Sequence, residues 1–100
     1  MKFVQIVGFE TERLEDMKQV LQEAEQHNAG KPGGPTYRML LKDRDHPNRY
    51  AALLEFESYD EAMRNSDAPE TGELAERLGA LCIGDRVYTN YDVLESGELK

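Results

Sequence analysis

The run of residues 2–9 places the strongest limit on how this chain can fold. It is apolar at both odd and even positions, and only Gln5 interrupts it after the opening lysine. Such a run predicts a β-strand that is buried on both faces. The chain has 100 residues, which fits one domain with one modest core. We therefore expect few residues to be left for covering a second face of a sheet.

The first half of the chain predicts a helix and a hairpin. Apolar residues recur at helical spacing from Leu14 to Ala24, and Gly30 is a stop signal that precedes a breaker-rich loop over residues 31–35. Residues 36–42 and 49–56 then read as two strands on either side of a turn-forming segment, which indicates a hairpin.

The second half predicts an interrupted helix and a last strand. Ser58 and Glu61 form a capping box at the start of the helix, and Pro69 suits the first turn of a second helical piece. Apolar residues then recur at helical spacing up to Gly84, which we expect to end the helix. Residues 86–93 alternate between apolar and polar as a final strand.

This order of elements is typical of one fold class. Strand, helix, strand, strand, helix, strand is the α+β ferredoxin-like βαββαβ arrangement, a four-stranded antiparallel sheet with two helices on one face. We expect residues 1–94 to form this single domain and residues 95–100 to form a polar tail. The sheet face without helices stays apolar, so we expect a second copy of the chain to cover it in a homodimer.

Charge and hydropathy limit the partners of the chain. Twelve Lys and Arg against twenty Asp and Glu give a formal charge of -8, which disfavours nucleic acid and anionic membranes. Residues 49–56 match part of the octapeptide of RNA-recognition motifs, but Ala51 and Leu53 cannot stack on bases. No apolar run approaches the roughly 20 residues that span a bilayer. The first residues lack a secretory signal, so we expect a cytoplasmic protein.

Neither the histidines nor the cysteine form a pattern typical of a metal or cofactor site. His27 is expected at a helix end and His46 in the hairpin turn. The lone Cys82 lies on the apolar face of the last predicted helix, where it is interpreted as a small buried side chain. Because metal-ligand spacings and glycine-rich phosphate loops are missing from the sequence, we expect no metal and no cofactor.

Polar and aromatic residues on the predicted strands are the candidates for a ligand site. Gln5 and Asn90 occupy strand positions that should be at least half-buried, so each must find a hydrogen-bond partner. Tyr and Arg side chains beside a cleft can orient a flat, oxygenated ligand and stabilise an enolate or phenolate, although subunit interfaces are also rich in both. The candidate ligand-binding residues are Gln5, Tyr37, Arg38, Tyr50, Tyr88 and Asn90.

The chain resembles the dimeric α+β barrel superfamily, which includes antibiotic-biosynthesis-monooxygenase-like proteins. The resemblance rests on the element order, on the interrupted helix around residues 65–70 and on the short last strand over residues 87–93. The resemblance implies two sheets facing each other across a dimer and a cleft between sheet and helices. It also implies a small, oxygenated, mostly apolar metabolite and a cofactor-free monooxygenase or isomerase. No catalytic motif is matched, so no catalytic residue is assigned. A non-catalytic structural or ligand-sensing homodimer stays open, with RNA binding a distant third.

Overall fold

The computed structural model describes residues 1–28 and 33–100. The elements are β1 (Phe3–Glu10), α1 (Leu14–Asn28), β2 (Tyr37–Lys42), β3 (Arg49–Phe56), α2 (Tyr59–Asp67), α3 (Pro69–Gly79) and β4 (Val87–Asp92). The predicted helix stop at Gly30 and residues 31–32 of the predicted loop lie outside the described residues. Among the helices in the described ranges, none is long and apolar enough to cross a membrane.

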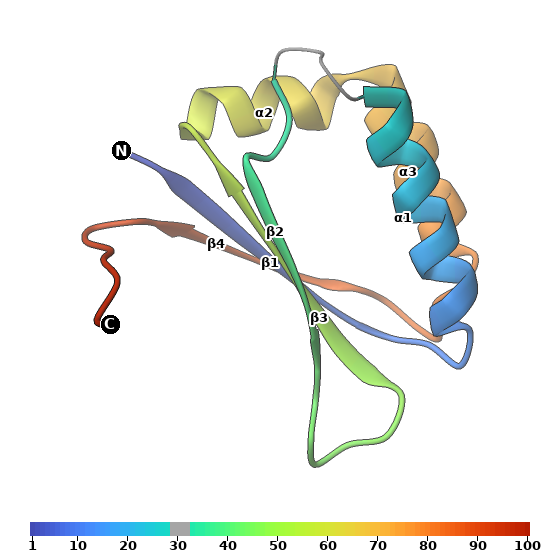
Figure 1. Ribbon diagram of the computed structural model, residues 1–100. Helices are drawn as coiled ribbons and strands as arrows, with labels where there is room; N and C mark the ends of the chain where they lie inside the picture. The colour runs from blue at the N-terminus through green and yellow to red at the C-terminus, as the bar shows by residue number, and fades with distance from the viewer. Residues whose placement is uncertain (29–32) are drawn as a thin grey trace.

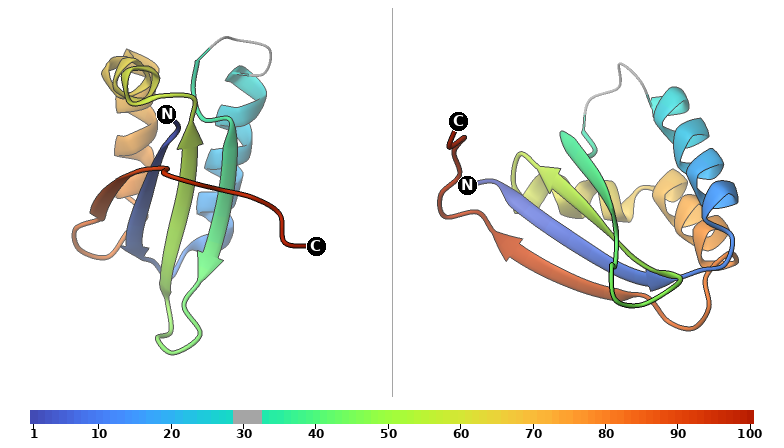
Figure 2. Two further views of the ribbon diagram at one scale, coloured as in Figure 1. Left: turned by 90° about the vertical axis from the view of Figure 1, so that its left-hand side faces the viewer. Right: turned by 60° about the horizontal axis from the view of Figure 1, so that its bottom comes forward.

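The four strands form one antiparallel sheet in the order β2-β3-β1-β4. The three helices lie on one face of this sheet (Figures 1 and 2). The predicted ferredoxin-like topology is therefore confirmed. The second predicted helix is divided at Ala68, because Pro69 lacks the N–H group that would continue the hydrogen-bond ladder and begins α3 instead.

The last helix ends earlier than the sequence predicts. We expected it to reach Gly84, but α3 ends at Gly79. The N–H group of Ile83 donates to the carbonyl oxygen of Glu10 at 2.7 Å, so this segment bonds to the end of β1 instead of continuing the helix. Cys82 consequently lies in the turn after α3, still partly buried, rather than on the apolar face of the helix.

Thr11 fastens the end of β1 to the helical layer. Its side chain is fully buried, and its Oγ1 donates to the carbonyl oxygen of Leu81 at 2.6 Å and accepts from the N–H group of Arg13 at 2.9 Å. The second bond satisfies an amide just before α1, which is the usual role of a capping threonine. At α2 the predicted cap is confirmed, because Ser58 Oγ accepts from the N–H group of Glu61 at 3.1 Å.

The packed core lies at one end of the sheet, beneath α2. Phe3 of β1, Phe56 of β3 and Ala62 of α2 are buried and pack together, and Leu54 and Met63 lie against them. Full burial of a large apolar side chain stabilises a fold by roughly 1.5–3 kcal/mol. This cluster therefore holds α2 firmly on the sheet.

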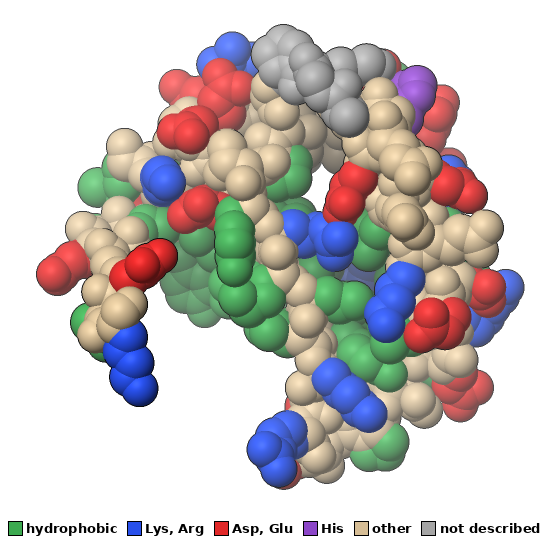
Figure 3. Space-filling model, viewed as in Figure 1, with side chains coloured by type: hydrophobic (Ala, Val, Ile, Leu, Met, Phe, Trp, Pro, Cys, Tyr) green, Lys and Arg blue, Asp and Glu red, His purple; other side chains and the backbone are tan. Residues whose placement is uncertain are grey.

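In contrast, α1 and α3 stand away from the sheet and pack against each other. An ion pair between Arg77 of α3 and Glu23 of α1, at 3.0 Å, also joins them. On α1 only Met17 is buried, although the helix carries a full apolar stripe. Figure 3 shows the molecule hollowed between the sheet and these helices. Part of the stripe on α1 is therefore left unburied beside this hollow.

Candidate functional site

The strand register decides which of the predicted residues share a surface. Directly paired residues of antiparallel strands project from the same face, and residues two apart on one strand do so as well. Gln5 lies two residues after Phe3, which packs beneath α2, and it pairs with Asn90 on β4. The predicted residues on this helix-facing surface are Gln5, Arg38, Tyr50, Tyr88 and Asn90. Tyr37 pairs with Glu55 on the opposite side, the outer face.

A polar row crosses the helix-facing surface from one edge of the sheet to the other. It consists of Arg38, Leu54, Gln5 and Asn90, with the leucine as its one apolar member. Nε2 of Gln5 donates to Oδ1 of Asn90 at 3.1 Å. This bond uses the carbonyl oxygen of Asn90, so the NH2 group of Asn90 remains a donor for another molecule. The two polar strand residues thus satisfy each other in part. Gln5 is partly buried as predicted, but the predicted burial of Asn90 is wrong, because β4 is an edge strand and Asn90 is exposed.

At the β2 edge, an ion pair joins the sheet to the helix that stands away from it. Nε of Arg38 meets Oε1 of Glu25 on α1, and both side chains are more than a third exposed. Such an exposed pair contributes little to stability, so it can separate when a ligand enters. The sequence analysis missed Glu25. Glu25 lies four residues after Leu21, at the border of the apolar stripe of α1, and this position could have indicated that its side chain lies near the sheet.

The row next to the polar row is apolar except at its β4 end. It consists of Leu40, Ala52, Val7 and Tyr88. The guanidinium group of Arg86 lies 5.9 Å from the centroid of the Tyr88 ring, and its Nη1 donates to the carbonyl oxygen of Ala75 on α3 at 3.0 Å. Arg86 therefore links the Tyr88 end of this row to the helical layer.

Stacked aromatic rings close the far end of the helix-facing surface. The ring of Tyr50 stacks on that of Phe9 with centroids 5.7 Å apart and 26° between the planes. Phe9 is buried and Tyr50 is half-buried. The surface thus combines an apolar floor with a few polar groups at its edges, a composition typical of small-molecule sites.

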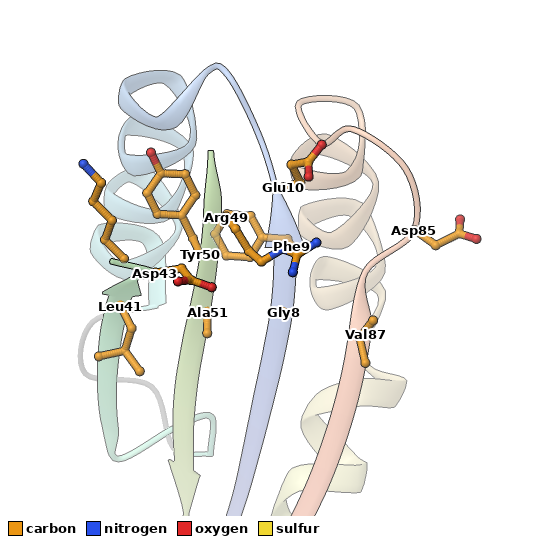
Figure 4. Close-up of a pocket in the computed structure, with 11 residues that line it drawn as sticks. Gly8, Phe9, Glu10, Leu41, Asp43, Arg49, Tyr50, Ala51, Asp85 and Val87 are labelled. Atoms are coloured by element: carbon orange, nitrogen blue, oxygen red, sulfur yellow. The ribbon is translucent and has the colours of Figure 1, made fainter. Parts of the chain in front are cut away.

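A separate depression of about 550 Å³ lies on the outer face, where the ends of the four strands come together (Figure 4). Gly8 and Ala51 form its centre, and Leu41 and Val87 flank them. Its charged lining residues are Glu10, Lys42, Asp43, Arg49 and Asp85. Of the predicted ligand-binding residues it contains Tyr50 alone. This depression therefore does not coincide with the Gln5–Asn90 pair.

The histidines lie where the sequence places them. His27 is in the last turn of α1, and His46 in the hairpin turn has its Nδ1 3.1 Å from Oδ2 of Asp43. The N–H group of Asp45 donates to Asp43 at 2.9 Å and lowers the pKa of that carboxyl group, an effect that His46 reinforces. Among the residues that the structure describes, no group of three or more His, Cys, Asp or Glu could hold a metal ion.

The chain is similar to solved structures although its sequence matches neither a protein-family model nor a curated protein. SnoaB, a cofactor-independent oxygenase from Streptomyces nogalater, has a TM-score of 0.77 at 19% identity, with 95% of each chain covered. A proposed antibiotic biosynthesis monooxygenase from Caulobacter crescentus has a TM-score of 0.78 at 15% identity, covering 94% of this chain and 91% of that one. Another from Deinococcus radiodurans has a TM-score of 0.76 at 13% identity, with 98% of each chain covered.

These similarities extend over nearly the whole chain. They show that the chain has the fold of antibiotic-biosynthesis-monooxygenase-like proteins, which confirms the predicted resemblance at the level of the fold. At identities of 13–19%, these similarities show the fold and nothing about the ligand or the reaction. Which residues bind a ligand stays a prediction, and it depends on the chemistry of the helix-facing surface.

Proposed function

We propose that this chain binds a small, largely apolar, oxygenated molecule on the helix-facing surface and oxygenates it without a cofactor. The observation that carries the proposal is the Gln5–Asn90 hydrogen bond, set beside an apolar row on the sheet face that borders the hollow. A polar pair of this kind can orient a ligand that the apolar row holds by burial. The activity of the structural neighbour SnoaB supports the choice of reaction.

The chemistry of such a reaction limits the substrate. Without a cofactor, the electrons that reduce O2 come from the substrate, which must therefore form a stabilised carbanion. A fused-ring ketone with an acidic CH2 group does so, because the negative charge moves onto the oxygen as a phenolate. The NH2 group of Asn90 and the hydroxyl group of Tyr88 are donors suited to this oxyanion. The CH2 group becomes a carbonyl, one oxygen atom of O2 enters the product, and the other leaves as water.

Oxygen uptake with anthrone, a fused-ring ketone with an acidic CH2 group, tests the proposal. We expect protein-dependent O2 consumption and formation of anthraquinone. Asn90→Leu should lower kcat/KM about 10- to 100-fold, because one oxyanion donor is lost. The matched control is Gln22→Leu, which removes an exposed amide from α1 and should leave kcat/KM unchanged. An Asn90→Leu chain that retains the full rate would contradict the assignment of Asn90.

A non-catalytic, ligand-sensing protein is the second candidate. The absence of a recognised catalytic motif from the sequence favours it, because the helix-facing surface could bind a ligand without turnover. Calorimetric binding of anthrone under nitrogen separates the two functions. Saturable binding that Gln5→Leu weakens, without O2 uptake when air is admitted, would select the sensor. Binding together with uptake would select the oxygenase.

We also propose that a second copy of this chain covers the outer face. Five large apolar side chains on this face are between 39% and 64% exposed, namely Tyr37, Met39, Leu41, Val87 and Tyr91. The chain exposes 7513 Å², whereas a folded monomer of 11.4 kDa exposes about 5,800 Å². The excess of about 1,700 Å² includes the extended tail, yet it is twice the roughly 800 Å² that each partner buries in a standard interface.

Light scattering coupled to gel filtration tests this dimer. We expect twice the mass of one chain, and a melting temperature that rises with protein concentration because association stabilises the folded state. A single-chain mass at micromolar concentration would contradict the dimer. The ligand-binding proposal would remain, since the helix-facing surface is built from one chain.

A further inference from the structure

Two rows of the outer face differ in height. The bulky row consists of Tyr37, Glu55, Val4 and Tyr91. The hollow row consists of Leu41, Ala51, Gly8 and Val87. The hollow row, which takes one residue from each of the four strands, forms the floor of the depression of about 550 Å³ (Figure 4). The bulky row lies at the opposite end of the same face.

Gly8 leaves a depression at the centre of the hollow row, although none of the described residues requires a glycine there. Its φ is not among the positive φ values of the described glycines. A Cβ atom at this position would lie 3.9 Å from its nearest neighbours, both on Val87, which is ordinary contact. Glycine in a strand interior weakens the strand and often marks a site where another group approaches closely. The missing side chain therefore indicates an occupant from outside the chain.

Two sheets that face each other about a two-fold axis, with nearly aligned strands, can meet in two ways. If the axis runs along the strands, the hollow row of one copy faces the same row of its partner. If the axis runs across the strands, the bulky row of each copy faces the hollow row of the other. The first arrangement traps two facing depressions, and an unfilled void in a packed contact is destabilising.

We propose that the two-fold axis runs across the strands, so that the bulky row of each copy fills the hollow row of its partner. The inference rests on the proposed homodimer and adds its geometry. Val4 lies over the partner's Gly8, and the tyrosines at the ends of the bulky row lie over the leucine and the valine at the ends of the hollow row. The absence of a side chain at Gly8 is then explained by the partner that occupies its space.

The charges of the outer face favour the same arrangement. Beside the bulky row, Lys2 forms an ion pair with Glu55 at 3.8 Å. Three carboxylates line the depression at the other end, from Glu10, Asp43 and Asp85. An axis along the strands would set Asp43, after β2, against the partner's Asp85, before β4, and facing like charges are destabilising, although the same axis would place Glu10 near the partner's Arg49. An axis across the strands brings Lys2 toward the carboxylates of the depression and Glu55 toward the partner's Arg49.

Cysteine cross-linking between copies tests this packing. Val4→Cys and Gly8→Cys are made separately in a Cys82→Ala background and oxidised with copper phenanthroline, alone and mixed. We expect a covalent dimer chiefly in the mixture, because neither position faces its own copy across the interface. The background chain is the control. We expect each variant to fold, since both positions are on β1 and neither is in the buried core. Circular dichroism checks this.

The outcomes separate the packing from the dimer. Failure of the mixture to cross-link, in a chain that light scattering shows to be dimeric, would overturn the packing and leave the dimer. Cross-linking of Val4→Cys with Glu55→Cys instead would also overturn it, because that contact belongs to an axis along the strands. A monomeric chain would overturn both. As a second test, Gly8→Leu should raise the dimer dissociation constant at least tenfold, and an unchanged value would contradict the proposal.

Discussion

The two faces of the sheet are built from the same strands but differ in how the chain covers them. On the helix-facing surface, Phe3 and Phe56 are buried beneath α2, and Gln5 bonds to Asn90. On the outer face, the largest side chains remain exposed, including Tyr37 at 52%. The chain thus buries parts of the helix-facing surface with its own residues and leaves the large side chains of the outer face uncovered.

The comparison also separates two kinds of unburied apolar surface. The helix-facing surface borders a hollow because α1 packs on α3 and stands away from the sheet. The outer face is exposed because the described helices all lie on the opposite side of the sheet (Figure 2). A hollow beside polar groups suits a ligand, whereas a broad apolar face suits another protein surface. One small domain can therefore provide both, on opposite sides of one sheet.

The largest expected effect distinguishes the faces by stability. Phe56→Ala should lower the free energy of unfolding by about 3–5 kcal/mol at every protein concentration, because it empties the core beneath α2. Leu53→Ala, on the outer face of the same strand, should act mainly by weakening the association of two copies. The resulting loss in the free energy of unfolding should therefore become smaller as the protein is diluted. Urea denaturation at several concentrations measures both. Equal, concentration-independent losses would contradict the difference between the faces.

A smaller effect is expected at the joint between the sheet and the helices. Thr11→Val preserves shape but leaves the N–H group of Arg13 and the carbonyl oxygen of Leu81 without their partner. The expected loss in unfolding free energy is about 1–3 kcal/mol. Thr11→Ser, which keeps the hydroxyl group, is the control and should recover most of the loss. If valine and serine behave alike, the hydroxyl group does not hold the two layers together.

The smallest expected effect concerns pH. Burial raises the pKa of the Cys82 thiol, and the nearby Arg86 opposes only part of this rise. The protonated thiol is therefore favoured in the folded state, and its stabilising contribution is lost as the pH rises through the pKa of the folded thiol. Alkylation by iodoacetamide should have its midpoint at a higher pH than for free cysteine. In urea the midpoint should return to the value for free cysteine, and identical midpoints in both states would contradict the shift.

The prediction from sequence succeeded where local patterns decide the structure. Apolar runs and apolar alternation predicted the four strands, Ser58 predicted the cap of α2, and Pro69 predicted the interruption of the second helix. It failed at Gly84, because the hydrogen bond from Ile83 to Glu10 joins residues far apart in the chain and ends α3 early. Glu25 was missed for the same reason, since its partner Arg38 lies on another element.

By itself, the sequence determined the element order, the fold class and the surplus of apolar strand surface, because these follow from periodicity, caps and length. Only the tertiary structure decided which side of the sheet each strand residue occupies. Shifting a strand by one residue exchanges its two faces, so the register alone brought Gln5, Asn90 and Tyr88 onto one surface and put Tyr37 on the other. Both the candidate ligand surface and the proposed partner surface depend on that pairing.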